Sequence, residues 1–334
     1  MMKAIFYTAQ AGNINGIYTD AQRKIIRSLM ELTDDIYTKE QILSAPERFS
    51  DVEFLFSTWG LEPLTEEEIK ACLPKLKAIF YAAGSVKSFA RPFLRCGVKV
   101  ISAWKANAVP VAEFAAAEIL LANKGFYHTM RISSGEDYMS AAREKQFFPG
   151  NFDATVGLIG YGAIGAQVAA RLKQYELNVQ VCSWALTAPD VLRDGYKLVS
   201  QEELFETSDV ISNHLADVDA TAGMIDYALL SRMKPYATFI NTGRGRQVVE
   251  SDLIRVLCER PDIMAVLDVT YPEPPQNGSP LYELANCIIT PHIAGSMGCE
   301  VRRMGLYMVE EASRLVKGEK LRFEVTEEML ATMA

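Results

Sequence analysis

The chain has 334 residues, of which 49% are hydrophobic and 23% are charged, and its formal net charge is -8. These values are typical of a globular protein with room for about two domains, and they argue against a disordered chain. The acidic balance, without any run of Lys or Arg, argues against nucleic acid and anionic membrane surfaces as partners.

Targeting and cysteine patterns point to a cytoplasmic protein. The start, MMKAIFYTAQAGNING, is polar where a signal peptide needs an apolar core, and the apolar run VPVAEFAAAEILLA is interrupted by Glu113 and Glu118. The six cysteines show no C-x-x-C spacing and no matching His cluster. This pattern predicts buried thiols in a reducing compartment, without a disulfide framework or a metal site.

Short apolar runs alternate with amphipathic, helix-length segments, which predicts an α/β fold with parallel sheets. In the first part of the chain, four strands are expected at KAIFY, DVEFLFSTW, LKAIFYAAG and VKVISAW. Helices are expected at residues 21–30 and 65–73, followed by a long helix at 109–126. The polar stretch 135–151 is expected to be irregular.

A second series of strands begins near residue 155. Six apolar runs are expected to form it: TVGLIG, NVQVCS, DVISNHL, ATFINT, IMAVLDV and CIITPH. Six parallel strands with intervening helices suit a dinucleotide-binding sheet. The amphipathic segment 300–317, which ends before Gly318, is expected to pack back on the first part.

A glycine motif lies between the first strand of this series and the next helix. The sequence VGLIGYGAIGAQVAARL places Gly160, Gly162 and Gly165 in G-x-G-x-x-G spacing. These glycines would allow a tight turn, close approach to a pyrophosphate and close helix packing, and the helix N-terminus would offer free N–H groups. We therefore predict nucleotide binding by the loop, with Ala163 and Ile164 included. A tight turn without a ligand is the alternative.

The residue that would select between cofactors is unusual. A carboxylate that holds the ribose hydroxyls is expected about 20 residues after the glycines, but Ser183 occupies the end of the second strand. The nearest arginine is Arg193, so no dedicated grip on a 2′-phosphate is visible. We expect NAD or NADP as cofactor, with NAD slightly favoured, and Ser183 could equally be a plain strand-end residue.

Several further motifs occur in a specific order: SDVISNHLADVDATAGMIDYALLSRMKPYATFINTGRGRQVVE, then LDVTYPEPP, then ITPHIAGS. Together they resemble the D-isomer-specific 2-hydroxyacid dehydrogenases. The resemblance implies a Rossmann domain, residues 104–296, inserted in a flavodoxin-like substrate domain, residues 1–103 plus 297–334. It also implies a homodimer built on the nucleotide-binding domain.

The resemblance assigns catalysis to Arg244, Glu273 and His292. Arg244 would hold the carboxylate of a 2-oxo acid through paired, charge-assisted hydrogen bonds. His292 would give a proton to the carbonyl oxygen during hydride transfer and take it back in the reverse direction, with Glu273 as its partner. Each residue taken alone has another interpretation. Arg244 could bridge loops at the surface, Glu273 could be a solvated charge in a proline-rich turn, and His292 could cap a strand end.

Other positions are assigned less directly. The resemblance adds cofactor contacts at Thr242, Gly243, Asp268, His292 and Gly295. Asp268 could instead cap a turn. His214 and His128 are interpreted as ordinary structural histidines, the first in a turn that lines the cofactor.

The substrate loop in the first part departs from the family pattern. It appears here as AGSVKS, with Lys87 where an aspartate usually stands, and the backbone N–H groups of Gly84 and Ser85 could still receive the carboxylate. The departures leave open which 2-oxo or 2-hydroxy acid is the substrate. An NADH-sensing, corepressor-like module that binds protein partners is the alternative function on the same fold.

Overall fold

The structure is a computed structural model that describes residues 2–130, 133–183 and 187–332. It contains two compact units, and each is described by itself. Unit 1 comprises residues 1–108 and 296–334, and unit 2 comprises residues 109–295. Within the described ranges, no helix combines the length and the apolar character needed to span a bilayer.

Unit 1 is built on a six-stranded sheet of order β13-β5-β4-β3-β1-β2. Its strands are β1 (Lys3–Tyr7), β2 (Glu31–Tyr37), β3 (Val52–Ser57), β4 (Ala78–Tyr81), β5 (Lys99–Ser102) and β13 (Glu324–Val325). All neighbouring pairs are parallel except β13 with β5. This doubly wound order confirms the flavodoxin-like architecture.

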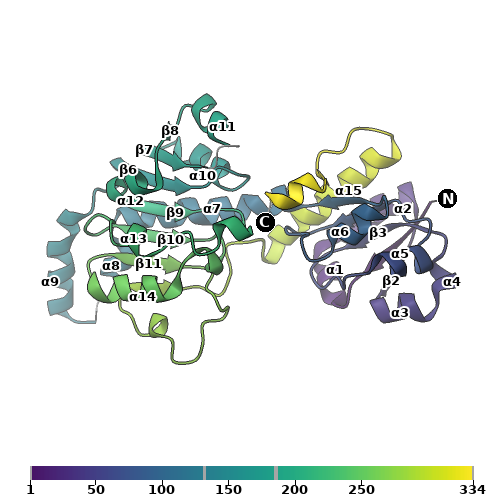
Figure 1. The fold of residues 1–334 in the computed structure, drawn as a ribbon, viewed down its shortest axis with the longest axis horizontal. Coiled ribbons are helices and arrows are strands. Elements are labelled where there is room, and N and C mark those ends of the chain that lie inside the picture. The colour runs from purple at the N-terminus through teal and green to yellow at the C-terminus, as the bar shows by residue number, and fades with distance from the viewer. Residues whose placement is uncertain (1, 131–132, 184–186, 333–334) are drawn as a thin grey trace. The chain divides into compact units, whose positions relative to one another are not determined.

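Helices cover both faces of this sheet (Figure 1). One face packs against α1 (Ala11–Ile17), α2 (Asp20–Leu29) and α15 (Val301–Val316), and the other against α3 (Lys39–Ser44), α4 (Pro46–Phe49), α5 (Glu66–Cys72) and α6 (Ala90–Arg95). Three of these helices, α2, α3 and α5, begin with a threonine capping box. The expected packing of the C-terminal helix on the first part of the chain is confirmed.

Unit 2 contains a parallel seven-stranded sheet of order β12-β11-β10-β9-β6-β7-β8. The strands are β6 (Phe152–Ile159), β7 (Glu176–Cys182), β8 (Lys197–Leu198), β9 (Val210–Asn213), β10 (Thr238–Asn241), β11 (Met264–Leu267) and β12 (Cys287–Ile289). The predicted α/β class, with two parallel-sheet units, is therefore confirmed.

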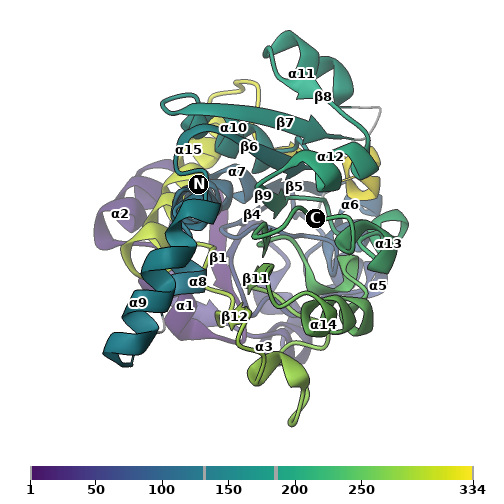
Figure 2. The ribbon, with the colours of Figure 1, turned by 90° about the vertical axis from the view of Figure 1, so that its left-hand side faces the viewer.

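Two sets of helices sandwich the sheet of unit 2 (Figure 2). One apolar core joins it to α7 (Trp104–Asn123) and α10 (Gly165–Leu172), and α8 (Phe126–Thr129) adds Tyr127. The other joins it to α12 (Gln201–Thr207), α13 (Tyr227–Leu230) and α14 (Glu250–Glu259). The remaining helices of the unit are α9 (Gly135–Glu144) and α11 (Ala188–Arg193).

Several expectations about the elements were wrong, and the two-residue β13 of unit 1 was not predicted. Strand β2, ELTDDIY, was missed because it pairs only with β1 at the sheet edge, where most of its side chains are exposed and polar. The two-residue β8 was also missed. The stretch 135–151 is not irregular throughout: α9 begins after Ser134, whose hydroxyl accepts a hydrogen bond from the Asp137 N–H.

The expectation of buried thiols holds for only some of the cysteines. Cys72 and Cys287 are buried, and Cys96 and Cys182 are partly buried, but Cys258 and Cys299 are exposed. Cys258 lies on α14, where the buried positions are those of Leu253, Val256 and Leu257, so its side chain belongs to the opposite, solvent-facing side of the helix.

Candidate active site

The glycine loop has the backbone geometry that a bound pyrophosphate requires. Gly160 has φ +94°, and a Cβ there would lie 2.7 Å from the carbonyl oxygen of His214. A Cβ at Gly165 would lie 2.1 Å from the Gly160 carbonyl oxygen, whereas one at Gly162 would have no heavy atom within 4 Å. The first and third glycines are thus needed for close packing, and the middle one leaves open space in front of the N-terminus of α10.

Ser183 directly follows β7, at the position where the ribose contact was expected. Its hydroxyl group hydrogen-bonds to the Thr187 hydroxyl group. The intervening residues 184–186 of the SWALTAP segment lie outside the described residues. Arg193 forms ion pairs with Asp190 at 2.6 Å and Asp194 at 3.1 Å, so its guanidinium is engaged by carboxylates of its own helix end.

His292 and Glu273 form a direct pair within unit 2. The His292 Nδ1 atom lies 2.6 Å from a Glu273 carboxylate oxygen. Both side chains remain accessible, with exposed fractions of 45% and 40%. A carboxylate on Nδ1 fixes the orientation of the ring, which leaves Nε2 to exchange a proton with a bound molecule.

The backbone at His292 is strained, with φ +56°. The His292 N–H donates to the Asp268 carbonyl oxygen at 3.1 Å, and the Asp268 carboxylate accepts hydrogen bonds from the N–H groups of Ile293 (2.8 Å) and Ala294 (2.9 Å). The Thr290 hydroxyl donates to the same carboxylate at 2.6 Å. The buried Asp268 therefore holds the turn that presents His292, as a turn cap does.

Arg244 lies in the loop after β10, next to Thr242 and Gly243. Its Nη1 atom donates to the Gly243 carbonyl oxygen at 2.8 Å, and the side chain is partly exposed. The next residue, Gly245, is packed directly on the segment that leads to Glu273, because a Cβ there would lie 2.0 Å from the Thr270 carbonyl carbon. The loop that carries Arg244 and the segment that carries Glu273 are therefore in backbone contact.

The predicted substrate loop lies in unit 1, after β4. The Ser102 hydroxyl contacts the carbonyl oxygens of Ala83 and Gly84 at 2.9 and 2.6 Å, which fixes the start of the loop. A Cβ at Gly84 would lie 3.6 Å from the Asn107 side-chain nitrogen. The loop that contains Gly84 and Ser85 therefore lies next to Asn107, in the first turn of α7, within unit 1.

The structure brings Asp268, Glu273 and His292 together through direct hydrogen bonds in unit 2. Arg244 lies in the same unit, on the loop that contacts Thr270, and Gly84 and Ser85 lie in unit 1. Sequence reasoning missed the roles of Gly245 and Thr290. Both lie inside the quoted motifs, but their partners, Thr270 and Asp268, are 20 or more residues away in the chain, and no local pattern reports such contacts.

His214 is a buried polar residue beside the glycine loop. Its side chain is 6% exposed, its Nδ1 atom lies 3.5 Å from the Thr242 hydroxyl oxygen, and its Nε2 atom has no hydrogen-bond partner among the described residues. Burial lowers the pKa of His214 from 6.5 to about 3. The ring is therefore neutral in the folded protein at physiological pH.

The chain is similar to a known family of proteins and to several of its members. Residues 119–294 match the family model described as the NAD binding domain of D-isomer specific 2-hydroxyacid dehydrogenase. The chain is 31% identical over 229 residues to D-3-phosphoglycerate dehydrogenase of Archaeoglobus fulgidus, covering 68% of this chain and 42% of that protein. It is 33% identical over 173 residues to human glyoxylate reductase/hydroxypyruvate reductase, covering 52% and 53%.

The alignments thus span about half the length of these curated relatives. Among solved structures, the apo form of Rhodotorula graminis D-mandelate dehydrogenase matches with a TM-score of 0.83 and 20% identity, over 98% of each chain. At this level of identity the likeness shows a shared fold.

The buried His214 predicts an acid-side loss of stability. The unfolded chain binds a proton at this histidine below pH 6.5, whereas the folded chain does not until about pH 3, so acidification between these values favours unfolding. This group should lower the free energy of unfolding by about 2 kcal/mol between pH 8 and pH 5. Denaturant unfolding of wild type and His214→Gln at both pH values measures it. Equal pH dependence in the two proteins would contradict the burial of a neutral ring.

Proposed function

The chain belongs to the D-isomer-specific 2-hydroxyacid dehydrogenase family, and we propose that it transfers a hydride reversibly between NAD(P)H and a 2-oxo acid, giving a D-2-hydroxy acid. The observation that carries the proposal is the 2.6 Å pair between His292 Nδ1 and Glu273, which lies on the same unit as the glycine loop. An accessible histidine with a carboxylate partner is suited to acid/base work on a carbonyl oxygen.

Each of the proposed reacting groups has a separate role. Arg244 binds the carboxylate of the oxo acid and orients the ketone beside it. His292 protonates the developing alkoxide from Nε2, and Glu273, hydrogen-bonded to Nδ1, keeps the ring in position for that transfer. In the oxidative direction His292 removes the hydroxyl proton. Gly84 and Ser85, in unit 1, are further proposed substrate-binding residues.

The nicotinamide cofactor would supply or accept the hydride when bound. The residues of unit 2 fit such a group, because the glycine loop combines a tight turn at Gly160, open space at Gly162 and close helix packing at Gly165. Five further residues would contact it: Ser183, Thr242, Gly243, Asp268 and Gly295. We propose NAD or NADP, with NAD slightly favoured.

Oxidation of NADH and NADPH in the presence of glyoxylate, pyruvate, hydroxypyruvate, phosphohydroxypyruvate and branched oxo acids tests the proposed reaction. We expect turnover with at least one of them. His292→Ala should lower kcat by roughly 10²- to 10⁴-fold, because the acid/base group is removed, while NADH still binds.

Comparable turnover in wild type and His292→Ala would contradict the role of the histidine. A wild type that binds NADH but turns over none of these acids would contradict the proposed reaction. That result would favour the corepressor-like alternative, in which the fold senses NADH and binds a protein partner.

Cofactor preference is tested at Ser183. A serine can hydrogen-bond to a ribose hydroxyl but does not repel a 2′-phosphate, so the wild type should discriminate weakly between NADH and NADPH. Ser183→Asp should penalise NADPH through like-charge repulsion, by about 1 to 3 kcal/mol. The ratio of kcat/KM for the two cofactors measures this, with Ser183→Ala as the control. An unchanged ratio in the aspartate variant would show that residue 183 does not contact the ribose.

We further propose that the chain forms a homodimer through the region around α9. This helix has no buried residue, and its Tyr138 and Met139 side chains are 60% and 55% exposed. Figure 1 shows α9 at the margin of unit 2. Neighbouring large apolar side chains are also exposed: Phe126, Met130, Phe147 and Phe152. Exposed apolar side chains gathered in this way are typical of a surface that a partner covers, and a second copy is the partner we propose.

Light scattering coupled to size-exclusion chromatography tests the dimer. The wild type should have twice the chain mass, and the double variant Tyr138→Glu, Met139→Glu should have the mass of one chain, because two charges oppose burial of the helix. Leu192→Glu is the matched control, since Leu192 is 62% exposed on α11. A monomeric wild type, or a double variant that remains dimeric, would contradict the proposal.

A further inference from the structure

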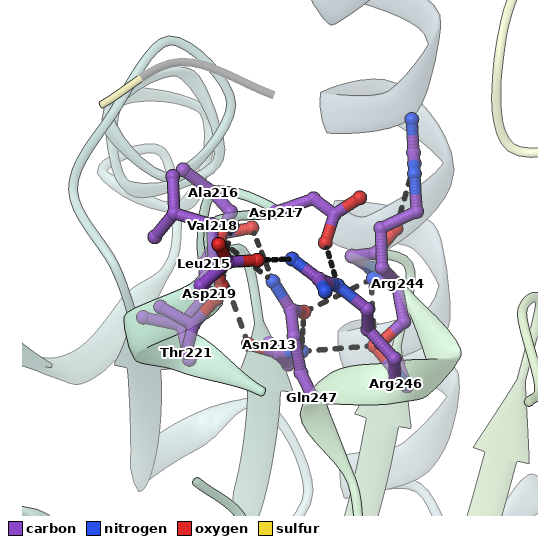
Figure 3. Close-up of polar contacts among 12 residues, drawn as sticks. Asn213, Leu215, Ala216, Asp217, Val218, Asp219, Thr221, Arg244, Arg246 and Gln247 are labelled. Carbon is purple, nitrogen blue, oxygen red and sulfur yellow. Dashed lines mark hydrogen bonds and ion pairs between the residues drawn. The ribbon is translucent and has the colours of Figure 1, made fainter. Parts of the chain in front are cut away.

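We propose that Gln247 is a positioning residue for Arg244, and that it links the Arg244 loop to the loop that follows β9. This inference rests on the proposed function, because it assigns to Arg244 the binding of the substrate carboxylate. The buried side-chain amide of Gln247 hydrogen-bonds to both loops, as Figure 3 shows together with its neighbours.

The Gln247 side chain is fully buried and its hydrogen-bonding capacity is complete. Its amide nitrogen donates to the carbonyl oxygens of Leu215 and Ala216, each at 3.0 Å. Its amide oxygen accepts from the Arg244 backbone N–H at 3.0 Å and from the Asn213 side chain at 2.7 Å. A glutamine amide offers two donors and two acceptor positions, so all four are used.

Two buried asparagines extend this amide across the sheet. The Asn213 side-chain nitrogen also donates to the Asn241 side-chain oxygen at 2.9 Å, and that oxygen accepts from the Gly243 N–H at 3.1 Å. Asn213 and Asn241 are paired in register at the ends of β9 and β10. The backbone on both sides of residue 243 is therefore fixed by side-chain amides rather than by the strand ladder.

The amide network binds the backbone N–H of Arg244, and the Arg244 guanidinium group makes no hydrogen bond to these amides. In Figure 3 the Arg244 side chain extends away from the amides, while its backbone takes part in the network. A carboxylate held by two parallel hydrogen bonds requires a well-placed guanidinium plane. A shift at the base of a long side chain moves that plane, so loss of the Gln247 contacts should weaken carboxylate binding first.

The other end of Gln247 reaches the neighbourhood of the glycine loop. Leu215 directly follows His214. A Cβ at Gly160 would lie only 2.7 Å from the His214 carbonyl oxygen, so this backbone packs closely on the glycine loop. Gln247 therefore connects the backbone that carries the substrate arginine to the backbone that supports the nucleotide loop. Arg246 joins the same two loops through ion pairs with Asp217 and Asp219, but these pairs are partly solvent-exposed and should contribute less.

The test compares the same substitution at two buried glutamines. Gln247→Met conserves volume but removes all four hydrogen bonds. Gln180→Met is the control: Gln180 is 4% exposed in unit 2, and its amide donates to the Thr207 and Ser208 hydroxyls instead of to the Arg244 loop. Both variants should lose stability, because buried partners are left unpaired.

Only Gln247→Met should weaken binding of the substrate. We expect kcat/KM for the oxo acid to fall about 10- to 100-fold, mainly through KM, with the control within about twofold of wild type. Amide hydrogen exchange at Arg244 should become faster in Gln247→Met alone. Asn213→Leu, which removes one of the two donors to the Gln247 oxygen, should shift KM in the same direction by less.

Equal KM values in Gln247→Met and Gln180→Met, despite similar losses of stability, would overturn the proposal and leave Gln247 a structural residue. Binding of oxamate, an unreactive isostere of an oxo acid, to the NADH-loaded protein gives a readout without turnover. If the wild type turns over no oxo acid, the proposed reaction fails. A weakening of oxamate binding by about tenfold or more in Gln247→Met alone would still support positioning, and equal affinities would refute it.

Discussion

The Asp268 carboxylate is the contact on which the candidate active site depends. It accepts hydrogen bonds from Thr290, Ile293 and Ala294, and it thereby holds a non-glycine residue, His292, at φ +56°. A left-handed backbone at a residue with a side chain costs free energy and persists only when its surroundings enforce it. Here the Asp268 carboxylate holds the turn, and the His292 N–H donates to the carbonyl oxygens of Asp268 (3.1 Å) and Thr290 (3.0 Å), so the turn that presents His292 to Glu273 depends largely on Asp268.

The parallel register places these groups at one edge of the sheet. Across the strands, Ile159, Asn213, Asn241, Leu267 and Ile289 are aligned partners. The residues that follow them by one position are Gly160, His214, Thr242, Asp268 and Thr290. The first turn of the glycine loop, the buried histidine, the start of the Arg244 loop and the carboxylate that holds His292 therefore form one row. Side chains from distant parts of the sequence meet there because the carboxyl ends of parallel strands share an edge.

This row explains how much the sequence could predict. Apolar runs locate the buried strands, and the glycine loop follows the first strand of its series, so both could be predicted from the pattern. Arg244, Asp268 and His292 were assigned through the resemblance of their motifs to a family. The polar edge strand β2 carries no such pattern, and the α9 helix has no buried face from which to infer it. The sequence does not distinguish Gln247 from an ordinary polar loop residue, because nothing local shows that its amide meets Asn213, 34 residues away. Contacts of this kind depend on strand order, which the sequence pattern leaves open.

The contacts that hold the proposed reacting groups can be followed within one unit. A Cβ at Gly245 would clash with the Thr270 backbone, so the Arg244 loop packs directly on the segment that leads to Glu273. Asp268 holds the turn of His292, and Gln247 links the Arg244 backbone to the backbone beside the glycine loop. All of these contacts lie within unit 2, so the mutual geometry of Arg244, Glu273 and His292 is set by one framework of parallel strands and the loops that follow them.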